Sequence, residues 1–171
     1  MAAQELELGV FFDTIVVCSV TGSTQAGMIV GFATQDRPRK VFGIDGSATA
    51  SQTWQQIARI ARQTAEAIGL DRPLGEDEIV PLDEWHAGTY GIPDRKTIEA
   101  IRLCAALEGV ITDPVYEGKS MAALIDLVGS RRIEPGSRVP LRPPGRAASS
   151  ECLRWRLLGF SRAVLPRACN G

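Results

Sequence analysis

The residues best suited to chemistry form the stretch CSVTGSTQAG at positions 18–27. The apolar run from Thr14 to Val17 predicts a buried strand before it, and the small residues from Ala26 to Ala33 predict a helix after it. A loop of Gly, Ser and Thr at this place suits an anion such as phosphate, because the first helical amides lack partners and the helix dipole is positive there. Gly22 permits close approach of the backbone to the anion. Further donors are the hydroxyls of Thr21, Ser23 and Thr24.

Spacing alone leaves a second interpretation of this stretch open. It also fits an ordinary strand-to-helix turn whose helix is capped by Ser23 or Thr24. The stretch is not a Walker loop, because no Gly-Lys-Ser/Thr follows the glycine, and it is not a GxGxxG dinucleotide motif.

Two further motifs contain the two tyrosines of the chain. Tyr90 lies in YGIP at positions 90–93, and Tyr116 lies in DPVYEGKS at positions 113–120. With CSVTGSTQAG, these motifs make the chain resemble the 1-aminocyclopropane-1-carboxylate deaminase family, pyridoxal-phosphate enzymes of the tryptophan-synthase-β fold group. The resemblance extends from about Ala3 to Arg138 and matches the C-terminal part of such an enzyme.

The resemblance implies pyridoxal 5'-phosphate as the cofactor and a small amino acid as the substrate. It also makes Glu117 the partner of the cofactor's pyridine nitrogen, where a carboxylate keeps that nitrogen protonated. Without the resemblance, a solvated loop acid is the simpler interpretation of Glu117. The implied contacts to the cofactor phosphate are Val20, Thr21, Gly22, Ser23 and Thr24.

Tyr116 and Tyr90 match two active-site tyrosines of the family and are the implied catalytic residues. A phenol is ordinarily a poor base, but a nearby cation lowers its pKa, and it could then attack or deprotonate the strained cyclopropane ring of the substrate. The implied reaction converts 1-aminocyclopropane-1-carboxylate and water to 2-oxobutanoate and ammonia. A buried tyrosine with one hydrogen bond is the alternative interpretation of either residue.

The family's Schiff-base lysine has no counterpart among Lys40, Lys96 and Lys119. The resemblance places that lysine upstream of the residues present here, and Lys119 is expected to be a structural or surface residue. The 171 residues alone are therefore predicted to be inactive by the family's route. A second hypothesis is a non-catalytic remnant that binds phosphate or the cofactor weakly. A third, a D-cysteine desulfhydrase-type lyase, is disfavoured by Glu117, because those relatives usually carry a small hydroxyl residue there.

The composition, 44% hydrophobic and 23% charged, fits one soluble globular domain. The formal net charge of -1 gives no reason to expect nucleic acid or an acidic membrane surface as a partner. No apolar run spans a bilayer and no leader pattern is visible, so we expect a cytoplasmic protein. One histidine, His86, and four cysteines without CxxC spacing predict no metal site. The resemblance implies homo-oligomers, although a partial chain need not form them.

Strand and helix patterns alternate, which predicts an α/β fold with a parallel, doubly wound sheet, tryptophan-synthase-β-like but incomplete. Met1 to Leu8 is predicted to form the last turns of a helix that Gly9 ends. Cys18 and Cys104 are expected to be buried. The predicted strands are 14–17, 40–45 and 78–82, the predicted helices are 26–33, 53–68, 94–107 and 121–128, and the predicted loops are 85–93 and 112–120.

The end of the chain has a different composition, with seven Arg, four Pro, no Lys and one Glu in residues 138–171. We predict two regions: 1–138, the C-terminal portion of the deaminase fold, and 139–171, an irregular tail with only a weak apolar patch at 155–160. After Ser-Arg-Val the family continues with roughly LYAHLGGQPA, whereas this chain reads PLRPPGRAAS. A one-base shift of reading frame near codon 139 explains the change, and a genuinely divergent tail is the alternative.

Overall fold

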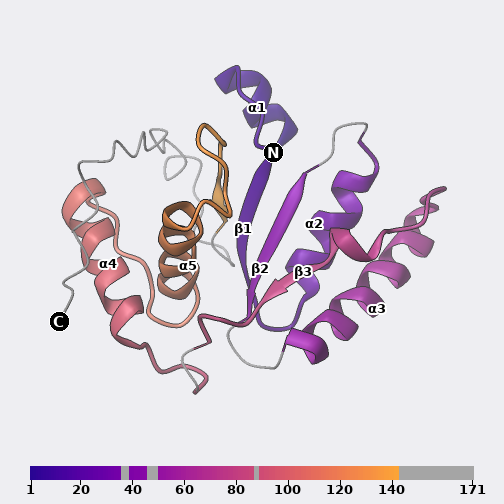
Figure 1. The fold of residues 1–171 in the computed structure, drawn as a ribbon. Coiled ribbons are helices and arrows are strands. Elements are labelled where there is room, and N and C mark those ends of the chain that lie inside the picture. Colours follow the sequence, from indigo (N-terminus) through magenta and orange to yellow (C-terminus); the bar gives the residue numbers. More distant parts are fainter. Residues whose placement is uncertain (36–38, 46–49, 87–88, 143–171) are drawn as a thin grey trace.

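The sheet that positions the functional residues is parallel and has the strand order β3-β2-β1-β4 (Figure 1). The computed structural model describes residues 1–35, 39–45, 50–86 and 89–142. The strands are β1 (Thr14–Ser19), β2 (Lys40–Asp45), β3 (Val80–Leu82) and β4 (Leu141–Arg142). The helices are α1 (Ala2–Leu8), α2 (Ser23–Ala33), α3 (Ala50–Ile68), α4 (Arg95–Glu108) and α5 (Glu117–Gly129), with one 3-10 turn, η1 (Glu76–Glu78).

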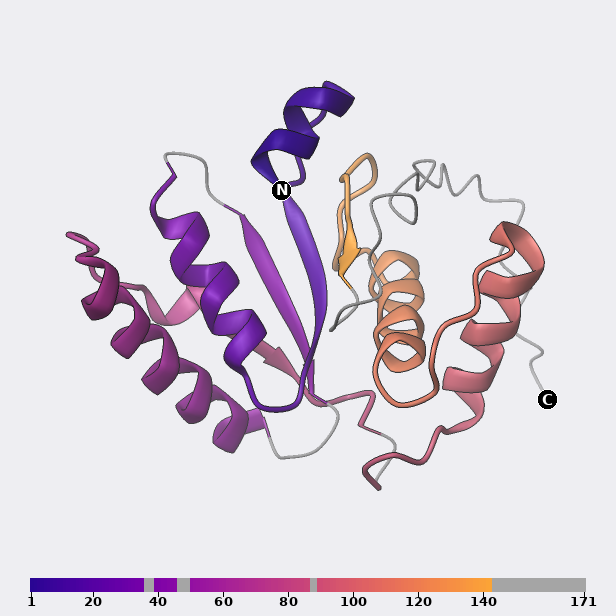
Figure 2. The ribbon, with the colours of Figure 1, turned by 180° about the vertical axis from the view of Figure 1, so that it is seen from behind.

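Helices cover both faces of the sheet, as the doubly wound prediction requires. α2 and α3 lie on one face, and α4 and α5 lie on the other (Figures 1 and 2). Alternate residues of β1 therefore enter two separate cores: Ile15 and Val17 pack in one, and Val16 packs in the other. All six residues of β1 are buried, which is why this strand is apolar throughout and does not alternate with polar residues.

The side chain of Gln25 ties α2 to the sheet. This fully buried residue donates from Nε2 to the carbonyl oxygens of Val41 and Val80, both at 3.2 Å. It thereby supplies two donors beside Pro81, which has no N–H to give to the sheet. Gly43 faces the same amide, and a Cβ at that position would overlap it. A glycine in the middle of β2 is thus explained by packing.

Most predicted elements are confirmed, and the larger differences lie at the starts of helices. β1 also continues to Ser19, beyond its predicted end, and the predicted loop 112–120 is wrong over its last four residues, which belong to α5. β2 has its predicted bounds, and Asp94 caps α4 by accepting a hydrogen bond from the Thr97 amide at 2.8 Å. α2 begins at Ser23 and α5 at Glu117, both ahead of their predicted starts. The predicted strand 78–82 divides into the end of η1 and the shorter β3.

The start of the predicted irregular tail contains a strand that its sequence pattern does not predict. Leu141 and Arg142 form β4 and pair with Val16 and Val17 of β1. Backbone pairing needs only free N–H and C=O groups on the neighbouring strand, so periodicity is not required, and the buried Leu141 side chain joins the core beside β1. The rest of the tail, including the apolar patch at 155–160, lies outside the described residues. Within the described chain, no helix has the length and hydropathy needed to cross a bilayer.

Candidate active site

The predicted phosphate cradle lies at the edge of the sheet where β1 ends and α2 begins. Gly22 is the N-cap of α2, with φ +76°, and within the described chain no side chain caps this helix. The amides of Ser23, Thr24 and Gln25 therefore precede the first intrahelical bond, and the Gly22 carbonyl accepts from Ala26 at 2.9 Å. The alternative interpretation, a helix capped by Ser23 or Thr24, is wrong.

Gly22 is restricted by its neighbour as well as by its backbone angle. A Cβ at this position would lie 2.7 Å from Cγ1 of Ile57 on α3. The same helix fastens the loop, because Nε2 of Gln56 donates to the carbonyl of Thr21 at 2.7 Å. α3 thus holds the cradle in an open form in which Thr21, Ser23 and Thr24 are exposed.

Ser19, the last residue of β1, has a buried hydroxyl with no partner among the described residues. A buried hydroxyl without a hydrogen bond is costly, so such a group at the mouth of an anion cradle is available to a ligand. Together with the uncapped amides of α2, it fits a phosphate group.

The two tyrosines are brought together. The phenol oxygens of Tyr90 and Tyr116 share a hydrogen bond, and their ring centroids are 6.4 Å apart in a T-shaped arrangement. Tyr116 is the N-cap of α5, and Tyr90 lies in the loop before α4. The hydrogen bond with Tyr90 raises the pKa of Tyr116 above its ordinary value. The protein residues alone therefore do not lower the pKa of Tyr116, and the expected lowering would need a bound cationic group.

Asp113 fixes the backbone that carries Tyr116 and Glu117. Its Oδ1 accepts from the amides of Val115 and Tyr116 at 2.7 and 2.9 Å, and its Oδ2 accepts from the amide of Glu117 at 2.8 Å. Its carbonyl accepts from Gly118 at 2.8 Å. Asp113 was not among the predicted site residues, although an Asp shortly before a helix is a recognisable capping signal.

The cradle and the Tyr116 segment meet at one edge of the sheet. The β1–α2 connection and the start of α5 lie at the same end of the strands (Figures 1 and 2). Cys18, next to the cradle, interacts with Ser120 of α5: burial raises the pKa of its thiol to about 11, and the Ser120 hydroxyl opposes that rise. Ligands of open α/β sheets bind at this edge, outside the carboxyl ends of the strands.

A family model that describes pyridoxal-phosphate-dependent enzymes matches residues 1–141. These residues include the whole edge of the sheet described above. The chain belongs to that family. Its cofactor is pyridoxal phosphate, and the uncapped amides and the unpartnered Ser19 hydroxyl fit the phosphate end of that molecule. The residues predicted to contact that phosphate, Val20, Thr21, Gly22, Ser23 and Thr24, lie in the connection from β1 to α2 and in the first turn of α2.

Similar proteins narrow the comparison within the family. The chain is 60% identical over 137 residues to a 1-aminocyclopropane-1-carboxylate deaminase of Burkholderia vietnamiensis, 62% over 138 residues to one of Burkholderia ambifaria, and 56% over 137 residues to one of Methylobacterium nodulans. Each match covers 80% of this chain and 40 or 41% of the relative, so the chain spans about 40% of the length of these relatives.

A solved structure supports the fold predicted for this chain. The crystal structure of an ACC deaminase homologue superposes with a TM-score of 0.64 and 28% identity, covering 75% of this chain and 38% of the other. The predicted resemblance and the parallel, doubly wound α/β fold are confirmed.

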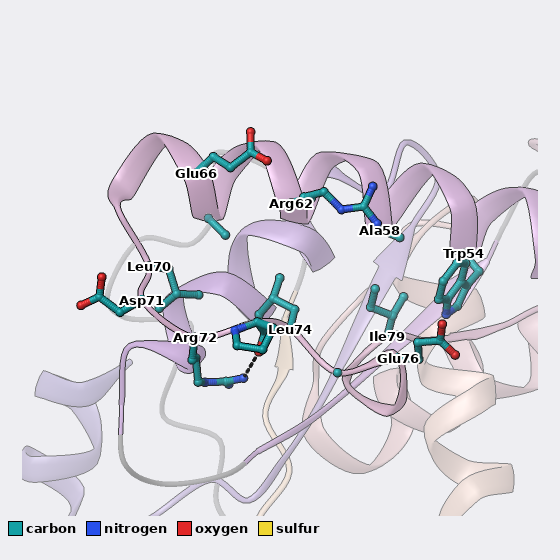
Figure 3. Close-up of a pocket in the computed structure, with 13 residues that line it drawn as sticks. Trp54, Ala58, Arg62, Glu66, Leu70, Asp71, Arg72, Leu74, Glu76 and Ile79 are labelled. Atoms are coloured by element: carbon teal, nitrogen blue, oxygen red, sulfur yellow. Dashed lines mark hydrogen bonds between the residues drawn. The ribbon is translucent and has the colours of Figure 1, made fainter.

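A concavity of about 440 Å³ lies between α3 and the segment from Leu70 to Ile79 (Figure 3). Trp54 of α3 contributes to its wall. At its rim, Arg72 donates to the carbonyl of Pro73 at 3.0 Å and to the carboxylate of Glu78 at 2.7 Å. Among the described residues, none of the predicted site residues lines this concavity, so it is separate from the cradle.

Proposed function

We propose that the chain supplies the phosphate cradle and the paired phenols of a 1-aminocyclopropane-1-carboxylate deaminase. The reaction takes 1-aminocyclopropane-1-carboxylate and water to 2-oxobutanoate and ammonia, a hydrolysis at a carbon–nitrogen bond. The observation that carries the proposal is the hydrogen-bonded pair of Tyr90 and Tyr116 at the sheet edge that also holds the cradle. The relatives of 60 and 62% identity support the choice of substrate.

Each group in this proposal has one task. When bound, pyridoxal phosphate supplies an electron sink for the substrate carbon that bears the amino group. The amides at the start of α2 and the exposed hydroxyls of Ser23 and Thr24 bind its phosphate. Glu117, the first residue of α5, keeps the pyridine nitrogen protonated.

The phenol pair moves a proton. Only one of the two oxygens can donate in their shared hydrogen bond, so Tyr90 Oη and Tyr116 Oη together hold one proton between them and one free to transfer. Because the bond with Tyr90 raises the pKa of Tyr116, this phenol is protonated at neutral pH until a positive group approaches. We assign the exchange of a proton with the opened three-membered ring to Tyr116 Oη.

We further propose that the 171 residues alone bind the cofactor without a covalent bond and do not turn over substrate. Lys40 pairs in register with Thr14, at the start of the strands and thus at the edge opposite the cradle. Nζ of Lys96 forms a 2.8 Å ion pair with Asp126. Nζ of Lys119 is buried and donates to the carbonyl of His86. We also propose a cytoplasmic location, in which the buried Cys18 and Cys104 thiols would stay reduced.

Binding to the cradle is tested with matched glycine variants. In Gly22→Ala and Gly109→Ala a glycine with positive φ is replaced, but only the Gly22 variant also collides with Ile57, since the space around Gly109 is open. We expect Gly22→Ala to bind pyridoxal phosphate at least about tenfold more weakly in equilibrium dialysis, a loss of about 1.4 kcal/mol, and Gly109→Ala to bind as the parent does. Equal binding by all three proteins would refute the assignment of the cradle.

Catalysis by the chain is tested with the same preparation. Borohydride trapping and peptide mapping should give no cofactor adduct on Lys40, Lys96 or Lys119, and a 2-oxobutanoate assay should give no product. A trapped lysine, or turnover, would overturn the proposed inactivity of the isolated chain while leaving the cradle intact.

A further inference from the structure

The segment before Tyr90 is attached to α5 at two points. Nζ of Lys119 donates to the carbonyl of His86 at 3.0 Å, and Nε1 of Trp85 donates to Oδ2 of Asp126 at 2.8 Å. Lys119 and Asp126 are about two helical turns apart, so both project from the same side of α5. The helix therefore holds two consecutive residues of this loop.

Lys119 is unusual because its side chain is completely buried, with 0% exposure. Burial of an ammonium group is costly, and lysines are rarely found in this state without a strong partner. The hydrogen bond to His86 is charge-assisted and therefore stronger than one between neutral groups. The cost of burying the Lys119 ammonium is therefore offset by its hydrogen bond to the loop. This indicates that the bond serves to fix the position of that loop.

The bond joins the two segments that carry the phenols. Lys119 follows Tyr116 on α5, and His86 precedes Tyr90 in the same loop. We propose that Lys119 is a positioning residue that holds the Tyr90 loop against the start of α5, so that the two phenols stay in hydrogen-bonding contact. The importance of that contact for catalysis rests on the proposed function, but the contact itself does not.

The chain allows a direct test, because it has only two tyrosines. Ultraviolet titration of the full chain without cofactor therefore reports only on Tyr90 and Tyr116. Loss of the Lys119 charge would by itself raise the pKa of the Tyr116 phenol, so a fall of that pKa in a Lys119 variant reports loss of the Tyr90 hydrogen bond. Lys119→Met keeps the length and the apolar stem of the side chain and removes the ammonium.

We expect the pKa of Tyr116 to fall in Lys119→Met toward the ordinary value of about 10. Tyr90→Phe should give the same value, and adding Lys119→Met to Tyr90→Phe should cause no further change. Lys40→Met, in which an exposed lysine at the opposite edge is replaced, should titrate as the parent does. An unchanged titration in Lys119→Met, or a further shift in the Tyr90→Phe background, would overturn the proposal.

A second measurement works at neutral pH. Tyrosine-labelled chain should show a ring-to-ring nuclear Overhauser effect between the two tyrosines in the parent and in Lys40→Met, and none in Lys119→Met. If far-ultraviolet circular dichroism shows that Lys119→Met is unfolded, Lys119→Gln takes its place with the same expectation, because its shorter, neutral side chain does not reach His86. A folded variant that keeps the effect and only melts earlier contradicts a positioning role. Loss of the effect, together with equal binding of pyridoxal phosphate by the parent and by Gly22→Ala, would retain the role of Lys119 and refute the cradle of the proposed function alone.

Discussion

Arg39 and Glu5 form a bidentate ion pair in which Nη1 lies 2.9 Å from Oε1 and Nη2 lies 2.8 Å from Oε2. The side chains are only 2% and 8% exposed. The Arg39 guanidinium also lies between the rings of Phe11 and Phe32, 4.6 Å from each centroid, and Glu5 accepts from the amide of Phe12. This pair anchors α1, the first helix, to the start of β2.

Removing one partner of this pair leaves a buried charge without compensation. We expect Glu5→Ala to lower the free energy of unfolding by about 3 kcal/mol, measured by urea denaturation. Glu7→Ala, on the exposed side of the same helix, should change it by less than about 0.5 kcal/mol. Equal stability of the two variants would show that α1 does not depend on the pair.

The contact between Gln25 and Gly43 predicts opposite effects for two glycine-to-alanine changes. Gly43→Ala places a methyl group on the Gln25 amide and should destabilise the protein by about 1–3 kcal/mol. Gly31→Ala, in α2 with open space around the new methyl group, should stabilise it by about 0.5–1 kcal/mol. Thermal melts of both variants check the signs, and a stabilised Gly43→Ala would contradict the packing around Gln25.

Asp126 gives a stability difference that depends on pH. Burial raises the pKa of its carboxyl group, but hydrogen bonds from Lys96 and Trp85 together outweigh burial, so the pKa lies below its ordinary value. A carboxyl group with a depressed folded-state pKa stabilises the protein above its unfolded pKa of about 4 and loses that effect as the pH falls through the folded value. Asp126→Asn should thus be less stable than the parent at pH 7, with the gap in urea midpoints narrowing as the pH falls below about 4. A gap that does not narrow at all as the solution is acidified would argue against this charge.

Cys18 is predicted to be unreactive in the folded chain. With its pKa raised to about 11 by burial, only about one thiol in a thousand is ionised at pH 8, and the thiolate is the reactive form. Alkylation with iodoacetamide, mapped by mass spectrometry, should be at least about a hundredfold slower at Cys18 than in the same chain in urea. Rapid labelling of folded protein would place this thiol in solvent.

Periodicity located the elements of this fold but not their first turns. α5 begins at Glu117 because the Asp113 carboxylate accepts the amides at its start, and that residue precedes the helix. Gly118 in the first turn also lowers the helix propensity of this segment, which was predicted to be a loop. α2 begins at Ser23 because Gly22 adopts a left-handed N-cap, although the hydroxyl residues after it also suit a loop.

The residues of the candidate site that belong to a sequence motif could be predicted. The residues that only hold other residues in place could not. CSVTGSTQAG and the two tyrosine motifs pointed to the edge where the structure brings them together. The tasks of Asp113 and Lys119 depend on contacts with backbone atoms, which residue types do not encode. The complete burial of Lys119 in particular could not be predicted, because its neighbours in the sequence are polar.

The strand order has a consequence for self-association. In the part of the chain that the structure describes, the outer strands are β3, with three residues including Pro81, and β4, with two residues. Short outer strands, and a proline that lacks an N–H, offer a second molecule little backbone with which to extend the sheet. Growth of amyloid-like ladders from these two described strands is therefore disfavoured.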